Sequence, residues 1–156
     1  MPTTMPPVGQ PAPNFTAVTE AGQQISLADY RGKWVVLYFY PKDNTPGCSK
    51  EACSLRDSFH VLSDVNAVVL GVSLDSPESH RKFIEKFGLP FTLIADTDTA
   101  VSTLYGVYGE KVRYGRTSTG ITRTTFIIDP AGVIAKVFTK VDVEHHGEEV
   151  LAVIRG

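Results

Sequence analysis

Cys48 and Cys53 are the only thiols of this 156-residue chain, and they lie five residues apart. Cys48 follows a turn-rich loop and precedes a run of apolar residues at helical spacing. If Thr45 is the N-cap and Pro46 the first helical residue, Cys48 takes the third helical position. Unpaired backbone N–H groups and the helix dipole favour an anion there. Because the thiolate is the nucleophilic form of cysteine, this position gives Cys48 a physical reason to be reactive.

Each cysteine also has an inert alternative, since a free Cys is often a small buried hydrophobe. Cys48 could belong to the apolar stripe of its helix, and Cys53 could fill the core next to Leu55. The C-x-x-x-x-C spacing differs from the C-x-x-C of thioredoxin-like reductants and of paired zinc ligands. A sulfenic acid on Cys48 would need a second thiol to condense with, and Cys53 is the only candidate. The pair therefore favours redox chemistry, either with turnover or as a disulfide switch.

The bulk properties exclude several classes of protein. Fifteen Lys and Arg against seventeen Asp and Glu give a formal net charge of −2, unlike the basic surface of a nucleic-acid binder. No stretch reaches the roughly 18 apolar residues of a membrane span, and residues 1–13 lack the features of a signal peptide. Two cysteines are no disulfide framework. We expect one domain over residues 1–156, in the cytoplasm, with neither nucleic acid nor membrane as a partner.

The cysteines must be positioned by a strand and a helix. Residues 34–40 form a continuous apolar and aromatic run, which predicts a central strand buried on both faces. The helix after it carries apolar residues at Ala52, Leu55, Phe59 and Leu62. The other predicted elements are a hairpin at residues 15–19 and 23–27, strands at 68–72, 91–95, 124–128 and 133–138, helices at 77–87, 100–105 and near the C-terminus, and a polar loop at 110–122.

This order of elements predicts the fold class. Strands alternate with helices, and a hairpin and a last helix follow. Such an order indicates an α/β protein, a three-layer sandwich with a central mixed sheet.

The pattern Pro41-x-x-x-Thr45-x-x-Cys48 resembles the active-site motif of the peroxiredoxins. The longer run YFYPKDNTPGC at residues 38–48, together with Cys53, resembles the bacterioferritin comigratory protein or peroxiredoxin Q subfamily, and so do residues 91–96, 108–111 and 123–129. The resemblance extends from about residue 10 to the C-terminus. It implies a thioredoxin-like fold with an added N-terminal β-hairpin. It also implies reduction of hydrogen peroxide and organic hydroperoxides, and recycling by thioredoxin or a similar dithiol donor.

The resemblance also assigns roles to residues. Cys48 would be the peroxidatic cysteine and Cys53 the resolving one, joined in an intramolecular disulfide. Thr45 would hydrogen-bond the thiolate and the peroxide, Pro41 would shield the site from water, and Arg123 would hold the attacked oxygens. Fixed donors aimed at developing charge lower the barrier of such a reaction.

Each supporting role has an alternative. Thr45 could be a plain helix cap, Arg123 a surface salt bridge, and Glu51 either a residue that orients Arg123 or an exposed helix acid. A thioredoxin-fold redox sensor that uses the Cys48–Cys53 disulfide as a switch is the second function to consider.

The remaining signals are weak. His145 and His146 have no acidic or thiol partners at ligand spacing, so we interpret them as a solvated helix entry and predict no metal. No phosphate-binding glycine loop is present, so no cofactor is implied. We expect a monomer, as many members of the family are.

Overall fold

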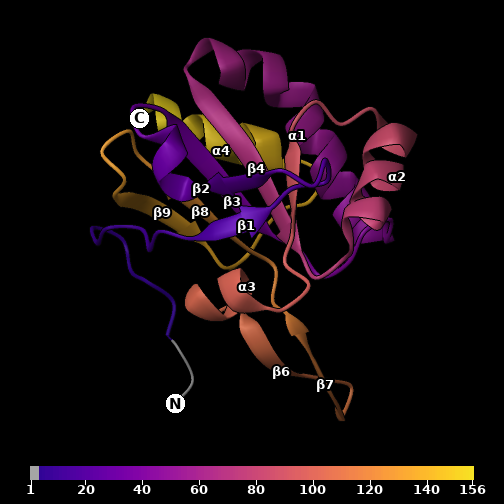
Figure 1. The fold of residues 1–156 in the computed structure, drawn as a ribbon. Helices are drawn as coiled ribbons and strands as arrows, with labels where there is room; N and C mark the ends of the chain where they lie inside the picture. Colours follow the sequence, from indigo (N-terminus) through magenta and orange to yellow (C-terminus); the bar gives the residue numbers. More distant parts are fainter. Residues whose placement is uncertain (1–3) are drawn as a thin grey trace.

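A five-stranded mixed sheet forms the centre of the computed structural model, which describes residues 4–156 (Figure 1). The strand order is β5-β4-β3-β8-β9, so β3 is the middle strand. β3 pairs in parallel with β4, which pairs in parallel with β5, whereas β8 is antiparallel to both β3 and β9. This topology confirms the predicted mixed sheet and its central strand. The strands are β3 (Trp34–Phe39), β4 (Ala67–Ser73), β5 (Thr92–Ala95), β8 (Thr124–Ile128) and β9 (Ile134–Phe138).

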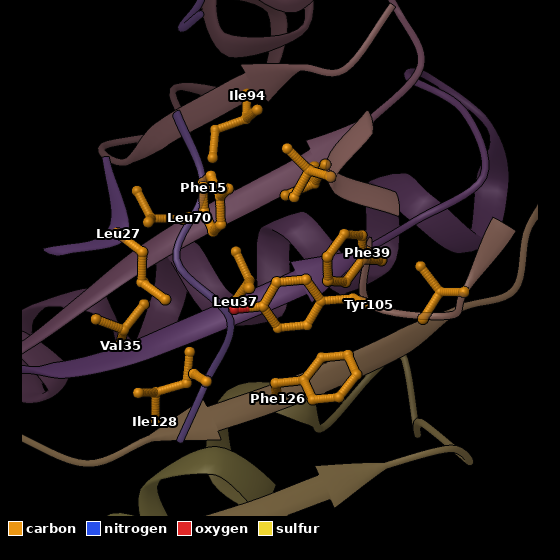
Figure 2. Close-up of a cluster of buried hydrophobic side chains, with 14 of the residues drawn as sticks. Phe15, Leu27, Val35, Leu37, Phe39, Leu70, Ile94, Tyr105, Phe126 and Ile128 are labelled. Atoms are coloured by element: carbon orange, nitrogen blue, oxygen red, sulfur yellow. The ribbon is translucent and has the colours of Figure 1, made fainter. Parts of the chain in front are cut away.

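Alternate residues of β3 point to opposite faces of the sheet, and each face has its own core. On one face, Val36 and Tyr38 pack with side chains of α1, α2 and α4. On the other, Leu37 and Phe39 meet Phe15, Tyr105 and Phe126 (Figure 2). Two covered faces give the three layers that the sequence predicted. The helices are α1 (Pro46–Asp64), α2 (Pro77–Phe87), α3 (Ala100–Leu104) and α4 (His146–Arg155), and η1 (Leu27–Tyr30) is a 3-10 turn.

Two hairpins lie outside the central sheet. β1 (Thr16–Val18) and β2 (Gln24–Ser26) pair antiparallel and confirm the added N-terminal hairpin. The prediction of a polar loop at residues 110–122 is wrong, because this segment belongs to a second hairpin. Its strands are β6 (Tyr108–Arg113) and β7 (Arg116–Ile121) (Figure 1). Tyr114 and Gly115 close it with φ values of 55° and 75°, which suit the twist of a two-residue hairpin turn.

α4 approaches α1 very closely at Gly147. A Cβ atom there would overlap the side chain of Ser58 and would lie 2.5 Å from the carbonyl oxygen of Ser54. The N–H of Gly147 donates to Ser54 Oγ at 2.9 Å. Only glycine allows this contact, which fixes α4 against α1 one residue after Cys53.

Within residues 4–156, the structure contains no helix that is both long and apolar enough to span a membrane.

Candidate active site

The start of α1 carries Cys48 as the sequence predicted. Thr45 is the N-cap, Pro46 is the first helical residue and Cys48 the third. The side chain of Cys48 is buried, with 1% of its surface exposed. Arg123 Nη2 donates a hydrogen bond to Cys48 Sγ at 3.3 Å. The structure thus joins a sulfur atom to a cation that lies 75 residues further along the chain.

A cleft of about 880 Å³ adjoins this sulfur. It brings together the predicted site residues Pro41, Thr45, Cys48 and Arg123. Gly47 leaves room for the guanidinium, since a Cβ there would lie 3.2 Å from Arg123 Nη2. The rest of the lining consists of Glu110, Lys111, Val112, Ser118, Thr122, Thr139 and Val141. The sequence did not identify the first four of these as lining residues, because all four belong to the β6–β7 hairpin, which it did not predict.

The Thr45 side chain does not act as a plain helix cap. Its hydroxyl donates to the carbonyl oxygen of Lys42 at 3.0 Å, and no side-chain cap bond to α1 is formed. The backbone of Thr45 still begins the helix, because its carbonyl oxygen accepts from the N–H of Ser49 at 2.8 Å. The hydroxyl oxygen therefore lies in the cleft wall with lone pairs to offer.

Arg123 and Glu51 form an ion pair in which Glu51 is fully buried and Arg123 is partly exposed to the cleft, so Glu51 is not an exposed helix acid. Arg123 Nη1 lies 2.5 Å from Glu51 Oε1, and the Glu51 side chain has no exposed surface. Burial raises the pKa of Glu51 to about 7, although the charge and hydrogen bond of Arg123 act in the opposite direction. Burial acts to lower the pKa of Arg123, but the negative charges of Glu51 and Cys48 outweigh it and raise that pKa. Glu51 thus orients Arg123 toward Cys48, which was one of the two alternatives.

Cys53 lies on α1, one turn and a half beyond Cys48, and both cysteines are free thiols. In a regular α-helix, residues five apart have their Cα atoms about 8 to 9 Å from each other. A disulfide needs Cα atoms at about 4.4 to 6.8 Å. The two sulfurs cannot bond while the first turns of α1 stay helical.

A buried hydrogen-bond cluster, which the sequence did not reveal, holds the loop before Cys48. Asp43 accepts from the Tyr40 hydroxyl at 2.6 Å and from Ser79 Oγ at 2.8 Å, and its other close neighbour is His80 Nδ1 at 2.8 Å. The backbone N–H of Asp43 donates to Asp75 at 2.8 Å. The helical spacing of His80 with Phe83 and Ile84 was the available signal that this histidine faces the core.

The same cluster contains the side chains best placed to approach a metal ion among the described residues. Ligand atoms of Asp43, Asp75 and His80 lie within 4.8 Å of one another. All three side chains already hold protein partners, since Asp75 Oδ2 also accepts from Ser73 and His80 Nε2 contacts the carbonyl oxygen of Ile94 at 2.8 Å. These hydrogen bonds are sufficient to explain the cluster, whose role is to hold the loop before Cys48 in place.

The two adjacent histidines differ in their surroundings. His145 is exposed, as predicted for a solvated helix entry, but the predicted lack of acidic partners is wrong, because His145 contacts Asp142 and His146 contacts Glu149. For His146 that interpretation is wrong, because its side chain is fully buried behind Glu51. His146 lies four residues before Val150, so it shares the apolar face of α4, and this spacing could have predicted its burial.

Comparison with known proteins gives a consistent result. The model of the AhpC/TSA family matches residues 8–137. The protein called putative peroxiredoxin bcp of Coxiella burnetii is 53% identical over 144 residues, which cover 92% of this chain and 95% of the relative. Peroxiredoxin Bcp of Bacillus subtilis is 43% identical over 95% of this chain and 94% of its own length.

Solved structures agree with the sequence relatives. Peroxiredoxin Q of Xanthomonas campestris superimposes with a TM-score of 0.85 at 38% identity, over 90% of this chain and 89% of that one. A Cys-to-Ser mutant of the Xylella fastidiosa protein PrxQ gives a TM-score of 0.89 at 37% identity, over 96% and 95%. With its thioredoxin-like fold and a buried thiol beside an arginine, the chain belongs to the AhpC/TSA family, within the Bcp and peroxiredoxin Q group, and is a peroxidase enzyme.

Proposed function

We propose that this enzyme reduces hydrogen peroxide and organic hydroperoxides with Cys48 as the nucleophile. The observation that carries the proposal is the bond from Arg123 to the sulfur of Cys48 at the floor of an open cleft. The thiolate attacks one peroxide oxygen, the O–O bond breaks, and the leaving oxygen takes up a proton to become water or an alcohol. Cys48 is left as a sulfenic acid.

The second half of the cycle uses Cys53. Its thiol condenses with the sulfenic acid, releasing water and forming the Cys48–Cys53 disulfide. Two thiols of a dithiol reductant such as thioredoxin then exchange with this disulfide and become oxidised themselves. The placement of both cysteines on α1 supports resolution within a single chain.

The other site residues support the first step. Arg123 is placed to stabilise charge on the sulfur and on the leaving oxygen. Thr45 would bond the peroxide through its hydroxyl, and Pro41 would limit water at the sulfur; both line the cleft. These roles fit a reaction in which fixed hydrogen-bond donors stabilise the negative charge that develops on the leaving oxygen.

The size of the cleft supports organic substrates as well as hydrogen peroxide. At about 880 Å³ it exceeds the needs of a molecule with two oxygen atoms, and Val112 and Val141 give it apolar walls. One solved Xanthomonas campestris relative, which is 37% identical, was studied for its alkyl peroxide reduction activity. An alkyl group would lie along those valines with its peroxide end at Cys48.

The test separates the two cysteines. We expect Cys48→Ser to abolish peroxide reduction. Cys53→Ser should still permit one oxidation to sulfenic acid, but it should impair turnover driven by thioredoxin, its reductase and NADPH. Mass spectrometry would identify the oxidised residue after one equivalent of peroxide. If Cys53→Ser lost the first oxidation and Cys48→Ser kept it, the roles would be reversed.

A further inference from the structure

Behind the Glu51–Arg123 pair, α4 contributes two more titratable side chains. His146 is fully buried, and its Nε2 lies 3.8 Å from Glu51 Oε2. Its Nδ1 lies 2.9 Å from Glu149 Oε1, and Glu149 is partly exposed. A line of side chains thus leads from Cys48 through Arg123, Glu51 and His146 to the surface at Glu149.

The partners of His146 define its tautomer. A carboxylate only accepts, so Nδ1 carries a hydrogen and donates it to Glu149. Nε2 then accepts from the Thr125 hydroxyl at 2.8 Å in the neutral ring. Burial lowers the pKa of His146, and the positive charge of Arg123 contributes in the same direction, so the neutral form dominates near pH 7.

This tautomer gives Glu51 Oε2 no donor. Among the described residues, Oε2 is a buried oxygen without a hydrogen-bond partner. An ionised Glu51 would therefore bury a charged oxygen with no donor beside it. A proton on Glu51 removes this charge, and a neutral buried oxygen without a partner costs less free energy than a charged one. The other groups around Glu51 are Cys48 and Arg123 on the cleft side and the buried hydroxyl of Tyr38, which likewise lacks a partner in the described part of the chain.

We propose that His146 is a positioning residue that, fixed as this tautomer, offers Glu51 no donor, keeps Glu51 protonated and thereby leaves the positive charge of Arg123 available to Cys48. A protonated Glu51 still accepts from Arg123 through Oε1 and so keeps the guanidinium in place. An ionised Glu51 would instead neutralise the guanidinium and weaken its attraction for the thiolate. The pKa of Glu51, raised by burial and by the charge of Glu149, agrees with this arrangement.

The inference rests on the proposed role of Cys48, but it can be tested without peroxide. In a Cys53→Ser background Cys48 is the single thiol, so the pH midpoint of its alkylation by iodoacetamide reports how strongly Arg123 favours the thiolate. His146→Gln places an amide donor beside Glu51 Oε2, which should stabilise ionised Glu51. We expect a higher alkylation midpoint and a rate at pH 7 that is lower by roughly 2- to 30-fold.

Three further variants make the test specific. Glu149→Gln removes the partner that fixes the His146 tautomer, and it should shift the midpoint in the same direction. His145→Gln is the matched control, because His145 is exposed and bonded to Asp142, and it should change nothing. Glu51→Gln imitates the protonated acid, so adding it to His146→Gln should restore the original midpoint. The infrared carbonyl band of a protonated buried carboxylic acid should be present in the parent protein near pH 6 and reduced in His146→Gln.

Two results would overturn the proposal. One is a His146→Gln shift that persists in the Glu51→Gln background. The other is an unchanged midpoint in His146→Gln together with lowered thermal stability, which would leave only a packing role. If instead the alkylation shifts appear but peroxide does not oxidise Cys48, the role of His146 in keeping Glu51 protonated stands and the peroxidase assignment of Cys48 fails.

Discussion

At the scale of single residues, the site depends on one sulfur and one guanidinium that the fold brings together. Cys48 alone would be a small buried side chain at a helix end. Arg123 gives the sulfur a fixed positive partner, and the hydrogen bond to Glu51 holds the guanidinium in the orientation that faces this sulfur. Residue types and spacing were enough to select Cys48, whereas the burial of Glu51 and the direction of Arg123 depend on contacts between α1 and the start of β8. No local pattern in the sequence encodes those contacts.

Replacement of Arg123 by Ala tests its part in the chemistry. We expect oxidation of Cys48 by peroxide to slow by about 10²- to 10³-fold, which is typical for the loss of one fixed donor to developing charge. The fold should survive, because Glu51 can take up a proton once its partner is absent. Stopped-flow measurement of the oxidation rate gives the result. Arg116→Ala, an exposed arginine of β7, is the control, and a rate for Arg123→Ala equal to that of the control would place Arg123 outside the site.

At the scale of elements, α1 has to be both a rigid platform and a segment that opens. While α1 is helical, the unpaired backbone N–H groups at its start favour a thiolate at Cys48. A disulfide with Cys53, however, requires the first turns of the helix to unwind. Glu51 lies between the two cysteines, so unwinding takes it out of its buried position. The protonation of Glu51 is therefore linked to the opening of the helix.

The sign of this linkage follows from the pKa of Glu51. That pKa is about 7 in the closed helix and near the ordinary 4.5 once the side chain is exposed. The closed helix therefore holds the proton more tightly, so protonation stabilises it fully below about pH 4.5. This stabilisation is lost as pH rises through about 7. The opening equilibrium should approach a tenfold increase per pH unit between about 5 and 7, and then level off.

Amide hydrogen exchange of the reduced protein can measure this opening. Protection factors of residues 49–53, corrected for the intrinsic base catalysis of exchange, should fall over that pH range and become constant above it. Glu51→Gln should have a flat profile. A flat profile in the parent protein would contradict the link between Glu51 and the opening of α1.

The elements also mark where sequence patterns succeed and fail. The apolar run of β3 and the start of α1 at Thr45 and Pro46 are strong local signals, and the structure confirms both. The β6–β7 hairpin has little buried surface to impose an alternating pattern, so its strands looked like a loop. Its one cue was the pair Tyr114-Gly115 at the turn. The burial of His146 was missed because it was interpreted together with its exposed neighbour His145. Only the position of each histidine relative to the apolar face of α4 distinguishes the two.

At the scale of the whole molecule, the catalytic cycle should leave most of the structure unchanged. The five strands and their two cores hold the cleft walls, and the cluster at Asp43 ties the loop before Cys48 to α2. We therefore expect motion to be limited to the start of α1. Local opening of this kind costs far less free energy than global unfolding, which makes it compatible with turnover.

Comparison of the reduced and disulfide forms tests this view. We expect residues 49–53 to lose most of their amide protection in the disulfide form, whereas α4 and the strands of the central sheet keep theirs. Hydrogen exchange followed by mass spectrometry of short peptides resolves these regions. Equal protection of residues 49–53 in both forms would rule out intramolecular resolution, and a disulfide between two chains would then be the better account.

The close contact of Gly147 with α1 bears on which of the two cysteines would move when the disulfide forms. It holds α1 at Ser54, immediately after Cys53, so unwinding of the turns before it would move Cys48 more than Cys53. In the proposed cycle, Cys53 would stay in place at one end of a short tether, and the oxidised sulfur of Cys48 would move to it. A tether of five residues confines that sulfur to a small volume around its target, so the second thiol acts at a high local concentration. Rapid condensation would shorten the lifetime of the sulfenic acid and so protect Cys48 from irreversible further oxidation. This protection would then depend on Gly147, a glycine in another helix.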